Sequence, residues 1–223
     1  MEILNTLYNL MGLVFVLGTI ASMGLSLTMQ QITGPLRNVR FVIVALLANF
    51  VIPPLVTFLL IRLFSLDQSL ATGLLLVSLA AGAPALPKTA VFAKVDTAAA
   101  TGLMVLLVVA TIVILPIALP LLLTGISVTF WDIASGLVYL ILIPLVVSLF
   151  VRARYPQVAE SAQPLFAQAS NLSLLALLVL MVVLNFSNVI GLIGSLGLIA
   201  SLILVIVATA GGYLLGMLGK VDK

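Results

Sequence analysis

The chain of 223 residues contains no cysteine and no histidine, and only 7% of its residues are charged. Without cysteine it can form no disulfide, no thiolate metal site and no thiol nucleophile. Without histidine it has no imidazole base and no Ser-His-Asp triad. Its net charge of +3, from 9 basic and 6 acidic residues, is too small for a nucleic-acid-binding surface. We therefore expect no enzyme, no bound cofactor and no nucleic-acid partner.

Hydrophobic residues are what the chain has in excess. They make up 64% of it and give a mean hydropathy of +1.42, whereas a soluble domain contains about 45–50%. The apolar runs are continuous, which excludes a membrane β-barrel, and a spanning helix needs about 20 such residues. The sequence predicts an all-α polytopic membrane protein, a single transmembrane domain over residues 1–223. About seven spans are predicted, at 9–30, 41–63, 69–93, 98–120, 134–151, 165–186 and 190–217.

Basic residues gather in alternate connectors between the predicted spans. The connector 31–40, Lys94, the connector 152–164 and the C-terminal tail hold seven of the nine lysines and arginines. The positive-inside rule makes that side cytoplasmic, so the odd number of spans places the N-terminus outside and the C-terminus inside. We expect an integral protein of a bacterial inner membrane. Trp131, in the longest outside loop, lies where an interfacial anchor is expected.

The third predicted span contains glycine and proline at Gly82, Pro84 and Pro87. Proline lacks an N–H, and it drives the residue before it out of the α-helical region. One discontinuous helix is therefore predicted, with its break near 82–87. A broken helix at membrane depth is typical of a binding site in transporters. The alternatives are a proline kink filled by neighbouring helices, or a helix end nearer the membrane surface.

Polar residues inside the spans are candidate ligands. Lys88 is either buried beside the carbonyls of the broken helix or extends to the cytoplasmic headgroups. Asn49, in the middle of the second span before Pro53 and Pro54, either binds a ligand or hydrogen-bonds to a neighbouring helix. The candidate substrate- or ion-binding residues are Asn49, Pro84, Pro87, Lys88, Thr89 and Thr101.

The last two spans carry small and polar residues with expected packing roles. Gly212 and Gly216 are four residues apart, a spacing that permits close contact between helices. Asn171 and Ser173 lie one to two turns into the sixth span, where they can face the membrane interface.

Three strings resemble the bile acid:sodium symporter family, in particular its bacterial sodium-dependent members. They are Met-Gly-Leu-Ser-Leu-Thr at 23–28, the amide-Phe-x-Ile-x-Pro string that starts at Asn49, and the Gly/Pro break before a short connector with Asp96. The resemblance covers nearly the whole chain. It implies an inverted-repeat fold, in which two discontinuous helices cross in a core domain beside a flatter panel domain. The panel would take 9–30, 134–151 and 165–186, and the core would take 41–63, 69–93, 98–120 and 190–217.

The chain departs from this family in its length. It ends before the second discontinuous helix, whose carboxylate serves both sodium sites in the family. The resemblance therefore implies an incomplete version of the fold. We expect a truncated member, a chain completed by missing C-terminal helices or a partner chain, or a shortened relative with another role.

The expected sodium ligands also differ. The Ser-Asn pair of the family falls on Leu86 and Pro87, and the ligands of the next span fall near Ala100 and Met104, none of which suits sodium. Only Asn49 occupies a position where the family places a sodium-binding amide, so sodium coupling is doubtful. The ammonium of Lys88 is a second hypothesis, either as a fixed cation or as a proton carrier whose pKa falls on burial.

The sequence thus predicts a secondary active transporter of a small organic anion, or a truncated portion of one, in the lipid bilayer. An anion is favoured by the resemblance and by the N-terminal end of the broken helix, whose dipole suits negative charge. The coupling ion is sodium or a proton. The alternative is a non-transport scaffold, or a membrane subunit that requires a partner chain.

Overall fold

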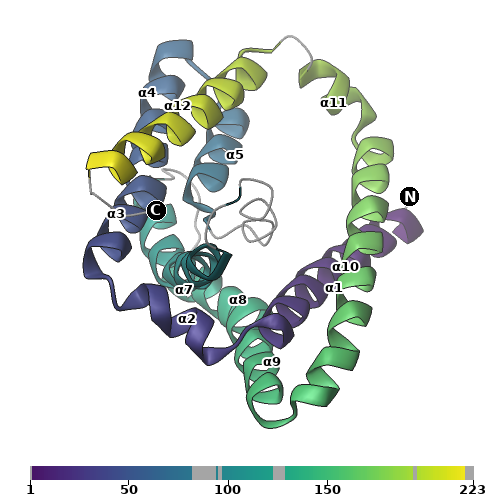
Figure 1. Cartoon of the computed structure of the whole chain (residues 1–223). Coiled ribbons are helices and arrows are strands. Elements are labelled where there is room, and N and C mark those ends of the chain that lie inside the picture. Colours follow the sequence, from purple (N-terminus) through teal and green to yellow (C-terminus); the bar gives the residue numbers. More distant parts are fainter. Residues whose placement is uncertain (1, 82–93, 95–96, 123–128, 193–194, 219–223) are drawn as a thin grey trace. The chain divides into compact units, whose positions relative to one another are not determined.

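A computed structural model describes residues 2–81, 94, 97–122, 129–192 and 195–218 (Figure 1). Over these ranges the protein is helical and contains no strand, and six stretches are long and apolar enough to cross a membrane. These are Glu2–Ser26, Val39–Phe64, Ala99–Leu122, Phe130–Arg154, Pro156–Leu184 and Leu196–Met217. The prediction of an all-α membrane protein is confirmed. The third predicted span is represented by a shorter apolar helix, Gln68–Leu79, and its remainder at 82–93 lies outside the described residues.

Several predicted connectors are helical. The helices are α1 (Glu2–Ser26), α2 (Met29–Leu36), α3 (Val39–Phe50), α4 (Ile52–Phe64), α5 (Gln68–Leu79), α7 (Thr97–Leu122), α8 (Phe130–Leu137), the π-helical turn η1 (Val138–Leu142), α9 (Ile143–Arg154), α10 (Pro156–Leu184), α11 (Phe186–Leu192) and α12 (Leu196–Leu218). The predicted connectors 31–40 and 152–164 are therefore helical over most of their length. Apolar length reports where a helix can cross a bilayer, whereas polar residues outside the bilayer also form helix. Pro156 fits the first turn of α10, where a missing N–H costs nothing.

The second span is a single apolar stretch built from two helices. α3 ends at Phe50, Val51 has φ −113° and ψ −54°, and α4 begins at Ile52. Pro53 and Pro54 explain the interruption, because the carbonyls of Asn49 and Phe50 would need N–H groups from these two prolines. The Val51 N–H still donates to Leu47 O at 3.1 Å, so the chain is helical up to the interruption.

The helices group into two compact units. Unit 1 comprises Met1–Met29 and Ser135–Ile193, which include α1, η1, α9, α10 and α11. Unit 2 comprises Gln30–Ala134 and Gly194–Lys223, which include α3, α4, α5, α7 and α12. Each unit is therefore assembled from two separate segments of the chain.

Close backbone contact holds unit 1 together. α1 packs antiparallel along α10 and also contacts α9. A Cβ atom on Gly18 would lie 3.2 Å from Phe166 O, and one on Gly24 would lie 2.5 Å from Ser148 Cβ. A side chain at Gly24 would force its neighbours apart, and one at Gly18 would need them to move by a few tenths of an ångström. Such small residues are common where membrane helices associate by van der Waals packing.

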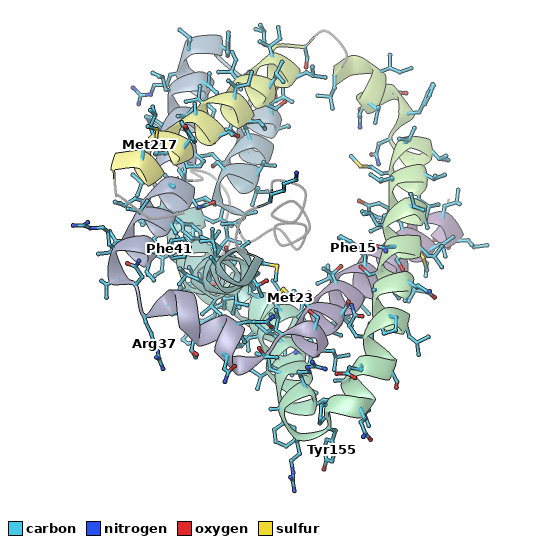
Figure 2. All side chains as sticks on the ribbon, in the orientation of Figure 1. Phe15, Met23, Arg37, Phe41, Tyr155 and Met217 are labelled. Atoms are coloured by element: carbon cyan, nitrogen blue, oxygen red, sulfur yellow. The ribbon has the colours of Figure 1, made fainter. Side chains whose placement is uncertain are left out.

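Side-chain hydrogen bonds join the same two helices of unit 1. The hydroxyls of Thr19 on α1 and Ser170 on α10 lie 2.5 Å apart, and Gln163 Nε2 donates to Ser22 Oγ at 3.1 Å. Ser170 Oγ is also 3.3 Å from the carbonyl of Phe15, which Figure 2 shows on α1. These bonds fix the register between α1 and α10.

Unit 2 is held by apolar contacts across α12. This helix packs against α4 and α3, as Figure 1 shows, and its Ala200 and Leu204 join Leu60 and Leu74 in a buried cluster. Two glycines of α12 make close contacts, because a Cβ on Gly211 would lie 3.0 Å from Ile52 Cδ1 and a Cβ on Gly197 would lie 3.0 Å from Leu70 Cδ1. No described atom lies within 4 Å of a Cβ placed on Gly212 or Gly216, so the contact predicted at these two glycines was wrong. Adjacent helical residues point about 100° apart, and Gly211 is the one that faces α4.

Candidate functional site

α5 crosses only part of a membrane. Its 12 residues span about 18 Å, against about 30 Å for the hydrocarbon core. The helix starts at a clear N-cap, where Asp67 Oδ1 accepts from the N–H of Ser69 at 2.9 Å. It ends at Leu79, and Ala80 is extended with φ −80° and ψ 101°. Pro84 explains this end, because it lacks the N–H that would bond to the Ala80 carbonyl.

A hydroxyl on α7 holds the chain just after this helix end. Thr111 Oγ1 lies 3.3 Å from Ala81 O and accepts from the Ala81 N–H at 3.4 Å. It is also 2.8 Å from Leu107 O in its own helix. Thr111 is buried and lies halfway along the spanning stretch Ala99–Leu122. The end of α5 is therefore fixed near the middle of a membrane-crossing helix.

The end of α5 carries a partial negative charge. The last carbonyls of any helix lack intrahelical donors, and the helix dipole adds to their potential. Leu75, Ser78 and Leu79 are buried in this region, and the Ser78 hydroxyl donates to Leu75 O at 2.8 Å. The carbonyls at the α5 end therefore suit a cation or a group with N–H or O–H donors.

Asn49 lies beside the other helix interruption of unit 2, in the last turn of α3. Its side chain is half-buried, and Nδ2 donates to Ala45 O of the same helix at 2.9 Å. The bond made by the amide nitrogen is thus local, and the amide oxygen is the atom of this side chain that could coordinate a cation. α3 and α5 contact each other, and both contact α7. Unit 2 therefore brings together two interrupted helices and one continuous helix.

The other predicted site residues fall into two groups. Thr101 lies on α7, is buried, and makes a polar contact. Four candidates lie outside the described residues, as does most of the predicted break at 82–87: Pro84, Pro87, Lys88 and Thr89.

One buried polar residue was missed by the sequence reasoning. Thr57 on α4 is fully buried, and Oγ1 has no hydrogen-bond partner among the described residues. Ser148 and Ser173, two other buried hydroxyls, bond to a carbonyl one turn earlier, Ser148 to Pro144 O at 2.6 Å and Ser173 to Ala169 O at 2.6 Å. The only signal in the sequence is a hydroxyl inside an apolar stretch, which does not distinguish a bonded threonine from an unbonded one.

A family model described as the sodium bile acid symporter family matches residues 11–195. The match includes all six candidate site residues and both interrupted helices of unit 2. No curated protein matches the chain.

Proposed function

Since the chain belongs to the sodium bile acid symporter family, we propose that it is a secondary active transporter of a small organic anion. The observation that carries this proposal is the end of α5 at Leu79, which Thr111 holds near the middle of a spanning helix. Discontinuous helices in transporters expose backbone ends at the membrane midplane, where ions and substrates bind. A scaffold protein has no need of such an end.

The two units suggest which helices form the panel and which form the core. Unit 1 contains the spans expected of a panel, and unit 2 contains those expected of a core. In support of this assignment, α1, α9 and α10 of unit 1 are joined by close backbone contacts and side-chain hydrogen bonds. The helix interruption at Val51 and the helix end after Leu79 belong to unit 2. Unit 2 is therefore our candidate for the unit that binds substrate and ion.

The negative end of α5 favours a coupling cation. Two cations fit the residues of this chain. One is sodium, with the amide oxygen of Asn49 as a ligand. The other is the ammonium of Lys88, which would exchange a proton during transport. Uptake driven by different ion gradients distinguishes the two.

The test is uptake by the full chain in proteoliposomes, with a radiolabelled conjugated bile acid as the probe. We expect uptake under an inward sodium gradient, with loss on replacement by choline, or uptake under a proton gradient that is lost in Lys88→Ala. In the sodium case, Asn49→Ala lowers uptake at least tenfold. Asn185→Ala is the matched control, because Asn185 Nδ2 also donates to a carbonyl four residues earlier, Met181 O at 3.2 Å, but lies in unit 1. A folded protein that takes up the probe under neither gradient overturns the proposal and favours the scaffold or subunit alternative.

A further inference from the structure

The two ends of the spanning stretch Val39–Phe64 both carry arginine, but their surroundings differ. Arg62 lies in the last turn of α4, where the helix dipole favours a cation, and its guanidinium carbon is 4.7 Å from the centre of the Phe58 ring. Arg40 lies in the first turn of α3, where the dipole disfavours a cation. Arg37 comes three residues earlier, in the turn after α2. We call Arg37 and Arg40 the arginine pair.

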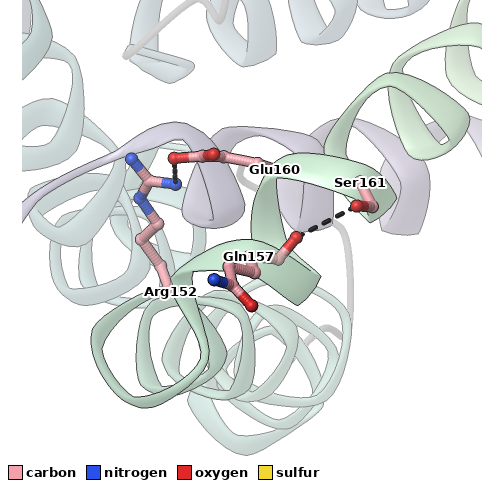
Figure 3. Close-up of polar contacts among 4 residues, drawn as sticks. All are labelled: Arg152, Gln157, Glu160 and Ser161. Atoms are coloured by element: carbon pink, nitrogen blue, oxygen red, sulfur yellow. Dashed lines mark hydrogen bonds and ion pairs between the residues drawn. The ribbon is translucent and has the colours of Figure 1, made fainter.

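No acidic residue balances the arginine pair within the part of the chain that the structure describes. The sequence has no aspartate or glutamate between Glu2 and Asp67, and the helices packed against α3 contain none. Neither guanidinium of the pair makes an ion pair or a hydrogen bond with a described residue. In unit 1, by contrast, Arg152 Nη1 and Glu160 Oε1 form an ion pair of 3.0 Å at the hairpin between α9 and α10 (Figure 3). The arginine pair is thus suited to an anion from another molecule.

The helix face that continues from the arginine pair is apolar. Arg40, Ile43 and Leu47 are separated by three and four residues, a spacing that places them on one face of α3. All three side chains are exposed. Arg37 is exposed as well, and Figure 2 shows its side chain pointing away from the neighbouring helices. The junction of α2 and α3 therefore offers two unpaired cations followed by an apolar surface.

We propose that this junction binds an anionic phospholipid, with the lipid phosphate on the arginine pair and an acyl chain along Ile43 and Leu47. Guanidinium groups bind phosphate through paired N–H donors, and anionic lipids attract basic residues that flank a membrane span. A zwitterionic lipid has the same chains, but its cationic group cancels the attraction. Inorganic phosphate could bind the arginines but would leave the apolar face uncovered. The lipid site is independent of the proposed transport.

The test uses tryptophan fluorescence, because Trp131 is the only tryptophan and Trp131→Phe leaves a background for one reporter. Ile43→Trp places the reporter three residues from Arg40, and Leu59→Trp places a matched one three residues from Arg62; both positions are exposed. The full chain is reconstituted in mixed phosphatidylcholine and phosphatidylglycerol, with quenching bromine atoms on the chains of one lipid or the other. We expect about a fivefold preference for phosphatidylglycerol at Ile43→Trp and little preference at Leu59→Trp.

Substitution of the arginines shows whether they cause the preference. Arg37→Gln combined with Arg40→Gln should abolish it at Ile43→Trp, whereas Arg62→Gln should leave it unchanged. A preference that survives the double substitution overturns the proposal, as does an equal preference at Leu59→Trp, which would reflect the net charge of the protein. Equal quenching by the two lipids also overturns it. So does quenching by neither, since a second protein chain would then cover this face.

A second measurement needs no substitution of arginine, in case the double variant fails to fold. Salt screens the attraction between exposed charges. The preference for phosphatidylglycerol at Ile43→Trp should therefore fall steadily as sodium chloride is added. A preference that does not change with salt would mean that the lipid is selected by something other than the arginine pair, and the proposal would be wrong.

Discussion

The helices of the two units are packed together in different ways. In unit 1, α1 and α10 run unbroken for 25 and 29 residues, and glycines and hydroxyls bring their backbones together. In unit 2, α3 gives way to α4 at Val51 and α5 stops at Leu79, and contacts between helices are largely apolar. Apolar side chains gain little from leaving lipid, so direct contacts and hydrogen bonds are what stiffen a membrane unit. The comparison distinguishes a unit of unbroken, closely packed helices from a unit in which helix interruptions leave backbone carbonyls without donors in their own helix.

The largest effect on stability should come from disturbing the close packing of unit 1 at Gly24. Its replacement by alanine puts a Cβ 2.5 Å from Ser148 Cβ and 3.2 Å from Leu145 O, so α1 and α9 must separate. Overpacking of this kind costs about 1–3 kcal/mol. We expect Gly24→Ala to lower the thermal unfolding temperature in detergent. Gly136→Ala is the control in the same unit, because nothing lies within 4 Å of its added Cβ. Equal stability of the two variants would mean that unit 1 is not held by close approach.

A smaller and more local effect is expected at Thr111 in unit 2. Thr111→Val removes the hydroxyl that accepts from the part-buried Ala81 N–H, and the loss of one such hydrogen bond costs about 0.5–1.5 kcal/mol. Hydrogen exchange of the amides at the end of α5 should become faster, while exchange in α1 and α10 stays unchanged. Thr209→Val is the matched control, because that exposed hydroxyl bonds only within α12, to Val205 O at 2.7 Å. Faster exchange throughout unit 1 would contradict the separation of the two units.

Structural features that depend on a few neighbouring residues could be predicted from the sequence. The apolar runs predicted the spanning helices, and the missing N–H of Pro84 accounts for the end of α5 close to the predicted break. Pro53 and Pro54 lie next to Asn49 in the sequence, yet they were not predicted to divide the span into α3 and α4. Proline occurs in many continuous membrane helices, and α7 contains two of them, Pro116 and Pro120.

Features that depend on helix rotation and pairing could not be predicted. Thr19 and Ser170 are 151 residues apart, and no local pattern indicates that their hydroxyls meet. Gly211 and Gly212 are neighbours, and only the packed helix shows which of them faces α4. In the candidate site, the sequence identified Asn49 and Thr101 by their polarity. It missed the anchoring role of Thr111 and the unbonded hydroxyl of Thr57, because both depend on which atoms lie opposite.

Thr57 is a second buried threonine of unit 2, and unlike Thr111 it makes no hydrogen bond within the described residues. Its hydroxyl is fully buried without a partner among the described residues, so it stabilises nothing there. Thr57→Val keeps the shape and removes an unsatisfied polar group, a change that is nearly neutral or stabilises by up to about 1 kcal/mol. We expect an unfolding temperature equal to or above that of the wild type. Thr111→Val is the control, because it is the same replacement of threonine by valine at a hydroxyl that does make hydrogen bonds. A marked loss of stability in Thr57→Val would show that its hydroxyl has a partner, which a ligand or water could provide.

The smallest effect is expected at the ion pair of the α9–α10 hairpin. Arg152 is 21% exposed and Glu160 is 68% exposed, so water screens their attraction, and such pairs contribute about 0.2–1 kcal/mol. A double-mutant cycle with Arg152→Gln and Glu160→Gln should give a coupling energy in this range that falls as salt is added. Arg154→Gln, two residues further along the same helix end, controls for the loss of one positive charge. The hairpin keeps Pro156 and the contacts of Gly18 and Gly24 in every variant, so its geometry should survive. A coupling energy well above this range would mean that surface charge, rather than close packing of glycines, determines how α9 and α10 are held in unit 1.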